Sequence, residues 1–213
     1  MINGLDGVDV GIMAAAGVAV LIGVLYALLR GNRGDPLERL AAWAQGRRLE
    51  YVAPPGDAVL ATFVGEVDGM RVAVEVTRVA RGFGVDLPTR LTTVTVGGGD
   101  PAPAGMPVSE PVCALQPAEW VLDRDGLEVG AALPSGDERF DQRWSARGAD
   151  AEAVSQVLSP AVRARLMESD AEGLIVEVRR GSVTIPMPGV CADARQLDRR
   201  LTLAMNLHTA LVA

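Results

Sequence analysis

Few side chains of this 213-residue chain could carry out nucleophilic or metal chemistry. It holds one histidine, His208, two widely separated cysteines, Cys113 and Cys191, and no lysine. A histidine-activated nucleophile, a Schiff base and zinc bound by its usual ligands are therefore not indicated, and we expect neither cofactor nor metal. His208 follows Leu201 and Ala204 on the apolar stripe of an expected helix, so we expect it to be packed.

Carboxylate chemistry remains open because the chain has 27 acidic residues, although no pair of them stands out. Asp123 and Asp125 precede Gly126 and resemble the start of a calcium-binding loop. Arg124 interrupts those ligands, and no glutamate stands at the required spacing. A plain turn is the better interpretation of this segment.

The most distinctive polar feature is a run of alternating residues from 139 to 147. Alternation predicts a strand with an apolar face and a charged face. The charged face consists of Arg139, Asp141, Arg143 and Arg147. It is a candidate docking face for an acidic partner, and the alternative is that it pairs with acidic residues of the same domain.

The overall charge narrows the range of partners. The net charge is −7, and residues 51–213 account for all of it, with 15 arginines against 22 acidic residues. An acidic domain repels phosphate backbones, so we exclude nucleic acid as a partner. The abundance of Ala, Gly, Val and Arg is typical of a G+C-rich genome and indicates a bacterial protein.

Residues 10–29 form an uncharged, apolar segment near the start of the chain. A helix of this length spans about 30 Å, the thickness of a hydrocarbon core, so we predict a transmembrane helix. Two aspartates precede it, and Arg30 and Arg33 follow it. This asymmetry predicts a single-pass protein of the inner membrane, with residues 1–9 outside and the following domain cytoplasmic.

Small residues recur at every fourth position of that segment, at Gly11, Ala15, Ala19 and Gly23. Such a ridge lets two helix backbones approach closely, which makes it a candidate contact for a homodimer within the lipid bilayer. The alternative is chance, since Gly and Ala are abundant throughout the segment.

The remaining sequence predicts an α+β fold. Asp35 and Pro36 are typical of a helix start, and Asp68-Gly69 is typical of a tight hairpin turn. A Gly- and Pro-rich linker over residues 97–111 follows a helix and β-meander over 35–96 and precedes an α+β sub-domain over 112–213. The predicted architecture is thus a transmembrane helix and a cytoplasmic antiparallel-sheet domain with packed helices. Whether its two halves are similar sub-domains is left open.

Two stretches carry a resemblance to a known group of proteins. This chain resembles small bacterial membrane-tethered proteins of unknown function in two segments. They are residues 140–166, which contain FDQRWSARG and SPAVRARLM, and the hairpin GEVDGMRVAVEV over 65–76. These are packing motifs, so the resemblance implies the architecture and carries over no catalytic residue.

We therefore predict a non-catalytic interaction or scaffold domain, tethered to the membrane and bound to an unidentified protein, rather than an enzyme. The alternative is a carboxylate-dependent hydrolase acting near the membrane. A deep pocket lined by convergent acidic residues would favour the hydrolase, and a flat surface would favour the scaffold.

Overall fold

The structure, a computed structural model, describes residues 34–54, 56–78, 90–97, 113–117, 132–148, 151–169, 174–179 and 181–213. Its helices are α2 (Pro36–Gly46), α3 (Glu138–Asp141), α4 (Ala151–Val157), α5 (Pro160–Glu168) and α6 (Ala194–Val212). Its strands are β1 (Glu50–Val52), β2 (Val59–Val67), β3 (Met70–Arg78), β4 (Arg90–Gly97), β5 (Cys113–Pro117), β6 (Ala132–Leu133), β7 (Trp144–Gly148), β8 (Val176–Arg179) and β9 (Ser182–Pro188).

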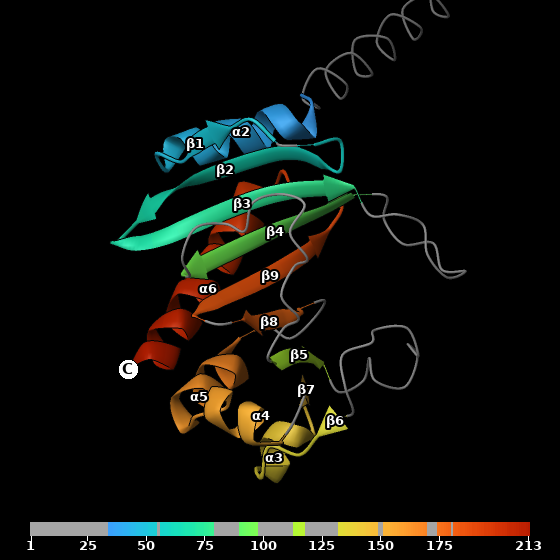
Figure 1. The fold of residues 1–213 in the computed structure, drawn as a ribbon, viewed down its shortest axis with the longest axis vertical. Helices are drawn as coiled ribbons and strands as arrows, with labels where there is room; N and C mark the ends of the chain where they lie inside the picture. Colours follow the sequence, from blue (N-terminus) through green and yellow to red (C-terminus); the bar gives the residue numbers. More distant parts are fainter. Residues whose placement is uncertain are drawn as a thin grey trace, which may run out of the picture.

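All nine strands belong to one antiparallel sheet with the order β1-β2-β3-β4-β9-β8-β5-β7-β6 (Figure 1). The two halves of the chain meet in its middle, where β4 pairs with β9 from Leu91 opposite Pro188 to Gly97 opposite Ser182. Residues 35–96 and 112–213 therefore both contribute strands to a single sheet.

The predicted fold class needs correction. The α+β content and the antiparallel pairing are present, but the sheet is continuous, and no helix of the described segments is both long and apolar enough to cross a membrane. The predicted span over 10–29 and its candidate contact (Gly11, Ala15, Ala19, Gly23) lie outside the described residues, as do residues 1–9 and almost all of the predicted linker.

Helix α2 and the β2–β3 hairpin form where short-range sequence patterns predicted them. The side chain of Asp35 accepts a hydrogen bond of 3.0 Å from the Leu37 amide and caps α2, with Pro36 in the first turn. The turn Asp68-Gly69 joins β2 to β3, with φ angles of 50° and 76° that suit a tight hairpin. The predicted helix start and hairpin are confirmed.

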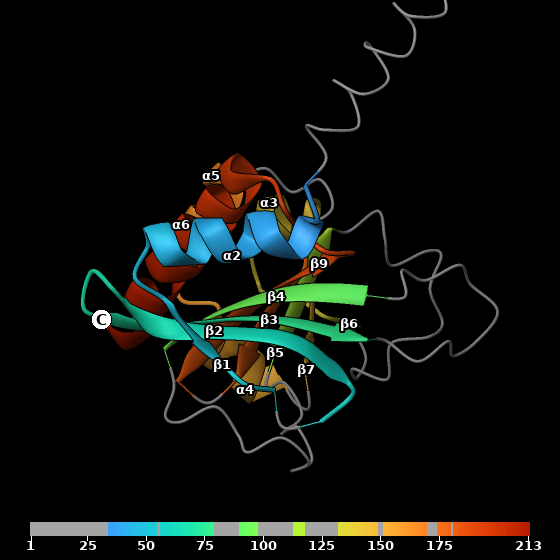
Figure 2. The same cartoon turned by 90° about the horizontal axis from the view of Figure 1, so that it is seen from above.

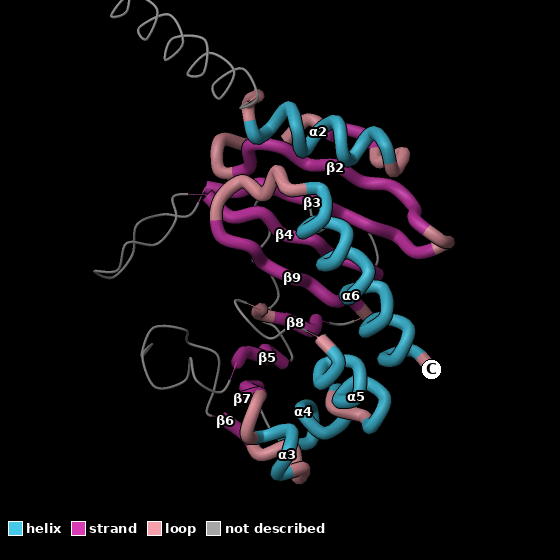
Figure 3. Tube along the Cα trace, turned by 180° about the vertical axis from the view of Figure 1, so that it is seen from behind, coloured by secondary structure: helices cyan, strands magenta, loops and turns pink. Residues whose placement is uncertain are grey.

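One face of the sheet forms the core, and the helices cover it. Figure 3 shows α6 lying across the strands and α2 running alongside β2, and Figure 2 shows both helices on the same side of β2, β3 and β4. Alternate residues of the central strands are buried beneath them: Val72, Val74, Val76, Val94, Val96, Val183, Ile185 and Met187. The apolar side of α6 completes this layer with Leu197, Leu201, Ala204 and Leu207.

A close approach between α6 and β4 fixes the position of the single histidine. Gly97 has a φ of +81°, and a Cβ on it would lie 2.0 Å from Nε2 of His208 and 2.6 Å from the Gly181 carbonyl oxygen. The imidazole thus lies directly against the backbone of Gly97. His208 is half-buried at this contact.

The other face of the sheet carries polar residues in its centre. Glu75 of β3 lies half-buried between its cross-strand neighbours Thr62 and Thr93, and burial raises the pKa of its carboxyl above the ordinary value. The charged form of Glu75 is therefore unfavourable in the folded protein.

Replacing Glu75 with Gln is expected to stabilise the protein at neutral pH. Because the pKa of Glu75 is raised in the folded state, its protonated form stabilises the folded protein fully at pH values below the unfolded-state pKa of about 4.3. This stabilisation is lost as the pH rises through the folded-state pKa. The gain in melting temperature over wild type should therefore be largest near pH 7 and vanish below about pH 4. Thermal unfolding across this range tests it, with the exposed Glu66→Gln as a matched control. A gain that does not change with pH would contradict the prediction.

Candidate functional site

The structure places the four residues of the predicted docking face on two different elements and the turn between them. The run from 139 to 147 is not one strand, because residues 138–141 form α3 and only 144–148 form β7. Asp137 caps α3 by accepting from the Phe140 amide at 3.1 Å. The alternation on which the face was predicted is thus broken by a helical turn.

The four residues of that face have different surroundings. Arg139 is exposed on α3, and Asp141 accepts from the Ser135 amide at 3.0 Å. Arg143 donates to the carbonyl oxygens of Met167 at 2.8 Å and Ser169 at 2.6 Å, which fastens the C-terminal end of α5. Arg147 is half-buried on β7. Of the four, Arg139 and Arg143 line one hollow of about 460 Å³ beside α5.

A polar contact joins α2 to α6. The indole Nε1 of Trp43 donates to Oδ1 of Asp198 at 2.7 Å, and the guanidinium of Arg47 pairs with the same carboxylate. That guanidinium also lies over the Trp43 ring, 4.7 Å from its centroid. We call Trp43, Arg47 and Asp198 the α2–α6 clasp.

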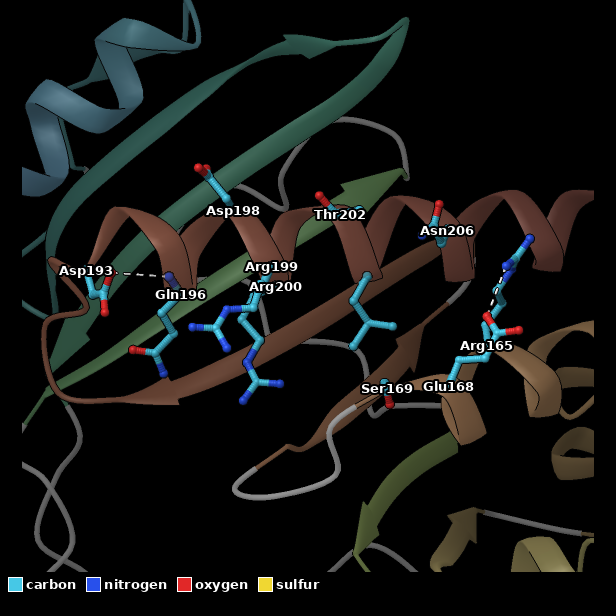
Figure 4. A pocket seen from close by; sticks show the side chains of 11 residues that line it. Arg165, Glu168, Ser169, Asp193, Gln196, Asp198, Arg199, Arg200, Thr202 and Asn206 are labelled. Carbon is cyan, nitrogen blue, oxygen red and sulfur yellow. Dashed lines mark hydrogen bonds and ion pairs between the residues drawn. The ribbon is translucent and has the colours of Figure 1, made fainter.

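A second hollow is an open groove of about 550 Å³ between α5 and α6. Figure 4 shows Arg199 and Arg200 extending from α6 into this groove, with Glu168 and Arg165 of α5 at one end. Thr202 and Asn206 line it further along α6. Three arginines, Arg165, Arg199 and Arg200, contribute to its lining.

The carboxylates of the groove do not converge. Asp198 points to the opposite side of α6 from Arg199 and Arg200 (Figure 4) and is bound in the clasp. Asp193 caps α6 by accepting from the Arg195 amide at 2.9 Å, and Glu168 pairs with Arg165 at 3.1 Å. Each of these acidic residues already holds a structural partner, so the described lining of the groove presents no pair of convergent acids of the kind a hydrolase would use.

Both cysteines are buried, free thiols in the structure. Burial raises the pKa of the Cys113 thiol to about 12, and burial also raises that of Cys191. The Cys191 amide donates to Oγ1 of Thr92 at 2.9 Å, and that hydroxyl donates to the Gly189 carbonyl at 2.8 Å. Within the described part of the chain, no group of three or more His, Cys, Asp or Glu residues could hold a metal ion.

Comparison with known proteins gives a fold and no family. No family model matches this chain. No curated protein matches it either. A solved structure does match: the mycobacterial trehalose monomycolate transport factor A, TtfA, at a TM-score of 0.50 over 82% of this chain and 93% of that chain, with 12% sequence identity. At this identity, the match shows that the two proteins share a fold.

The groove was missed from the sequence, although one signal was present. The dipeptide Arg199-Arg200 places two adjacent positive charges on an amphipathic helix. What the sequence did not reveal is the packing of α5 beside α6, which places Arg199 and Arg200 in the lining of a groove.

Proposed function

We propose that this chain is a non-catalytic interaction domain that serves lipid transport at the cytoplasmic face of a bacterial inner membrane. The observation that carries the proposal is the fold shared, across most of both chains, with TtfA, the mycobacterial trehalose monomycolate transport factor A. The unidentified protein partner would then be another component of a transport assembly.

The chemistry of the described residues supports a role in binding. The carboxylates around the α5–α6 groove are held in a helix cap and in ion pairs, and both thiols are buried with raised pKa values. A catalytic nucleophile or general acid needs a pKa suited to its step and an approach to substrate. Arginines projecting from α5 and α6 suit anionic groups instead.

Depletion of the protein in its host tests the transport role. We expect a newly made, radiolabelled lipid to accumulate in the inner membrane and to decline at the cell surface, with recovery when the full chain is supplied again. An unchanged lipid distribution after depletion would overturn the proposed role.

Charge-neutral variants test whether the role is catalytic. Glu168→Gln and Asp193→Asn each keep the side-chain size and remove one groove carboxylate, so both should restore lipid transport in depleted cells. A variant that melts like wild type but fails to restore it would favour the carboxylate-dependent hydrolase.

A further inference from the structure

One edge of the sheet exposes apolar side chains to solvent. Strand β1 forms this edge, α2 leads directly into it, and Figure 1 shows both elements together at one end of the long axis of the molecule. On β1, the side chain of Tyr51 is 60% exposed and that of Val52 is 44% exposed. Neighbouring residues of a strand project to opposite sides, so this edge is apolar on both faces. Adjoining exposed apolar residues are typical of surfaces that contact proteins or membranes.

The ring of Tyr51 is held in place at its base. It lies edge-on to the buried ring of Phe63, with 5.8 Å between the centroids, and the two residues are paired across β1 and β2. Because this contact restricts the ring while most of it still faces solvent, little conformational entropy is lost when it is bound. Tyrosine combines an apolar ring with a polar hydroxyl, which suits the interface between lipid and water.

The residues around this apolar pair carry no net charge. Residues 35–54 contain three arginines and three acidic residues, whereas the whole chain has a net charge of −7. The exposed residues in the second half of α2 are the uncharged Ala42, Gln45 and Gly46, and the exposed Ala53 follows Val52. Attraction to anionic lipid is therefore weak at this end, and apolar contact must supply most of the binding free energy.

The chain enters the fold at the same end. The transmembrane helix is predicted over residues 10–29, and α2 begins at Pro36. The six residues 30–35 between them can span at most roughly 20 Å. Such a short connection keeps α2 and β1 close to lipid, whereas β6 forms the opposite edge of the sheet. The bilayer is then present at a high effective concentration beside Tyr51 and Val52.

We propose that the α2–β1 end of the fold is a membrane-contacting surface, which places Tyr51 and Val52 in the head-group region of the bilayer. The inference rests on the proposed function, because the predicted transmembrane helix brings this surface to the membrane. Use of both faces of the edge makes the sheet meet the bilayer end-on, with β6 farthest from the lipid. Since the surface has no net charge, its docking should change little with added salt or with the fraction of anionic lipid.

A fluorescent label beside the two side chains tests the proposal. The full chain carrying Ala53→Cys is labelled with the polarity-sensitive dye NBD and reconstituted into phosphatidylcholine vesicles. Both native thiols are buried, and wild type measures any labelling of them. Val212→Cys is the matched reporter, because Val212 is also apolar and is 65% exposed. It lies at the C-terminal end of α6, away from α2 and β1 (Figure 1).

We expect the label at position 53 to emit at shorter wavelength than in water and to be quenched by phosphatidylcholine that carries a nitroxide near its head group. The label at position 212 should emit as in water. Adding Tyr51→Ser and Val52→Ser should lower the ratio of docked to undocked chains about tenfold and so abolish both effects at position 53. Val52→Ser alone should cause a smaller loss, and it serves if the variant with both serines does not fold.

Three results would overturn the proposal. Equal quenching at positions 53 and 212 would reveal general attraction to lipid. A blue shift at position 53 that grows with the protein-to-lipid ratio, without quenching by nitroxide lipid, would assign the surface to a second copy of the chain. A label at position 53 that emits as in water, with or without the serine substitutions, would show that the surface does not reach the bilayer.

Flotation of the vesicles separates this proposal from the proposed function. A chain that floats with the vesicles and restores lipid transport in depleted cells, but whose label at position 53 stays in water, removes the membrane-contacting surface and leaves the proposed function intact. A chain that does not float with the vesicles removes the predicted transmembrane helix. The surface and the membrane location in the proposed function are then both overturned.

Discussion

Gly97→Ala is expected to destabilise the protein by about 3–5 kcal/mol, a large share of the 5–15 kcal/mol typical of a folded domain. The added Cβ would lie 2.0 Å from Nε2 of His208 and 2.6 Å from the carbonyl oxygen of Gly181. A φ of +81° is also unfavourable for alanine. Because β4 lies in the middle of the sheet, the strain cannot be released at an edge. Chemical denaturation measures the loss.

Gly69→Ala separates the two causes of that loss. Gly69 has a similar φ of +76°, but nothing lies within 4 Å of its added Cβ, so only the backbone penalty of about 1–2 kcal/mol should remain. Adding His208→Ala to Gly97→Ala should recover part of the stability by removing the closest contact. Equal losses at Gly69 and Gly97 would show that the imidazole does not restrict this position.

Asp198→Ala is expected to cost about 2–3 kcal/mol by opening the α2–α6 clasp. The substitution removes the acceptor of the Trp43 indole, whose side chain is only 6% exposed, and so leaves a buried N–H without a partner. The ion pair with Arg47 contributes little to this figure because the Asp198 side chain is 43% exposed. Hydrogen exchange should locate the loss in α2.

A double-mutant cycle checks this assignment. Trp43→Phe removes the donor and keeps most of the ring, so the combined variant with Asp198→Ala should lose less than the two single variants added together. Asp198→Asn retains an acceptor oxygen and should cost less than Asp198→Ala. Strict additivity between Trp43 and Asp198 would show that their hydrogen bond does not stabilise the fold.

Features encoded over short distances could be predicted from the sequence. The Asp35 cap, the Asp68-Gly69 turn and the stripe of α6 each depend on residues within a few positions of one another. The pairing of β4 with β9 has no such signal, since alternating Val and Thr residues fit several neighbours equally well. That missing long-range information is why one sheet could not be distinguished from two sub-domains.

The strand predicted over residues 139–147 is interrupted for a different reason. Phe140 and Trp144 fit a strand by parity, but their spacing of four also fits a helical turn, and Asp137 stands at a capping distance from Phe140. Once α3 forms, Arg143 reaches the end of α5 and becomes a structural residue. Side-chain alternation alone could not reveal that tertiary contact.

The central position of β4 has a consequence for synthesis on the ribosome. Strands β2, β3 and β4 emerge early, yet β4 packs against α6 and its free edge is paired by β9, and both of these elements lie near the end of the chain. From Gly97 to Ala194, translation at about 5–20 residues per second takes roughly 5–20 s. For that interval the nascent chain presents an apolar face and an unpaired strand edge, which makes it a natural client for chaperones that bind nascent polypeptides.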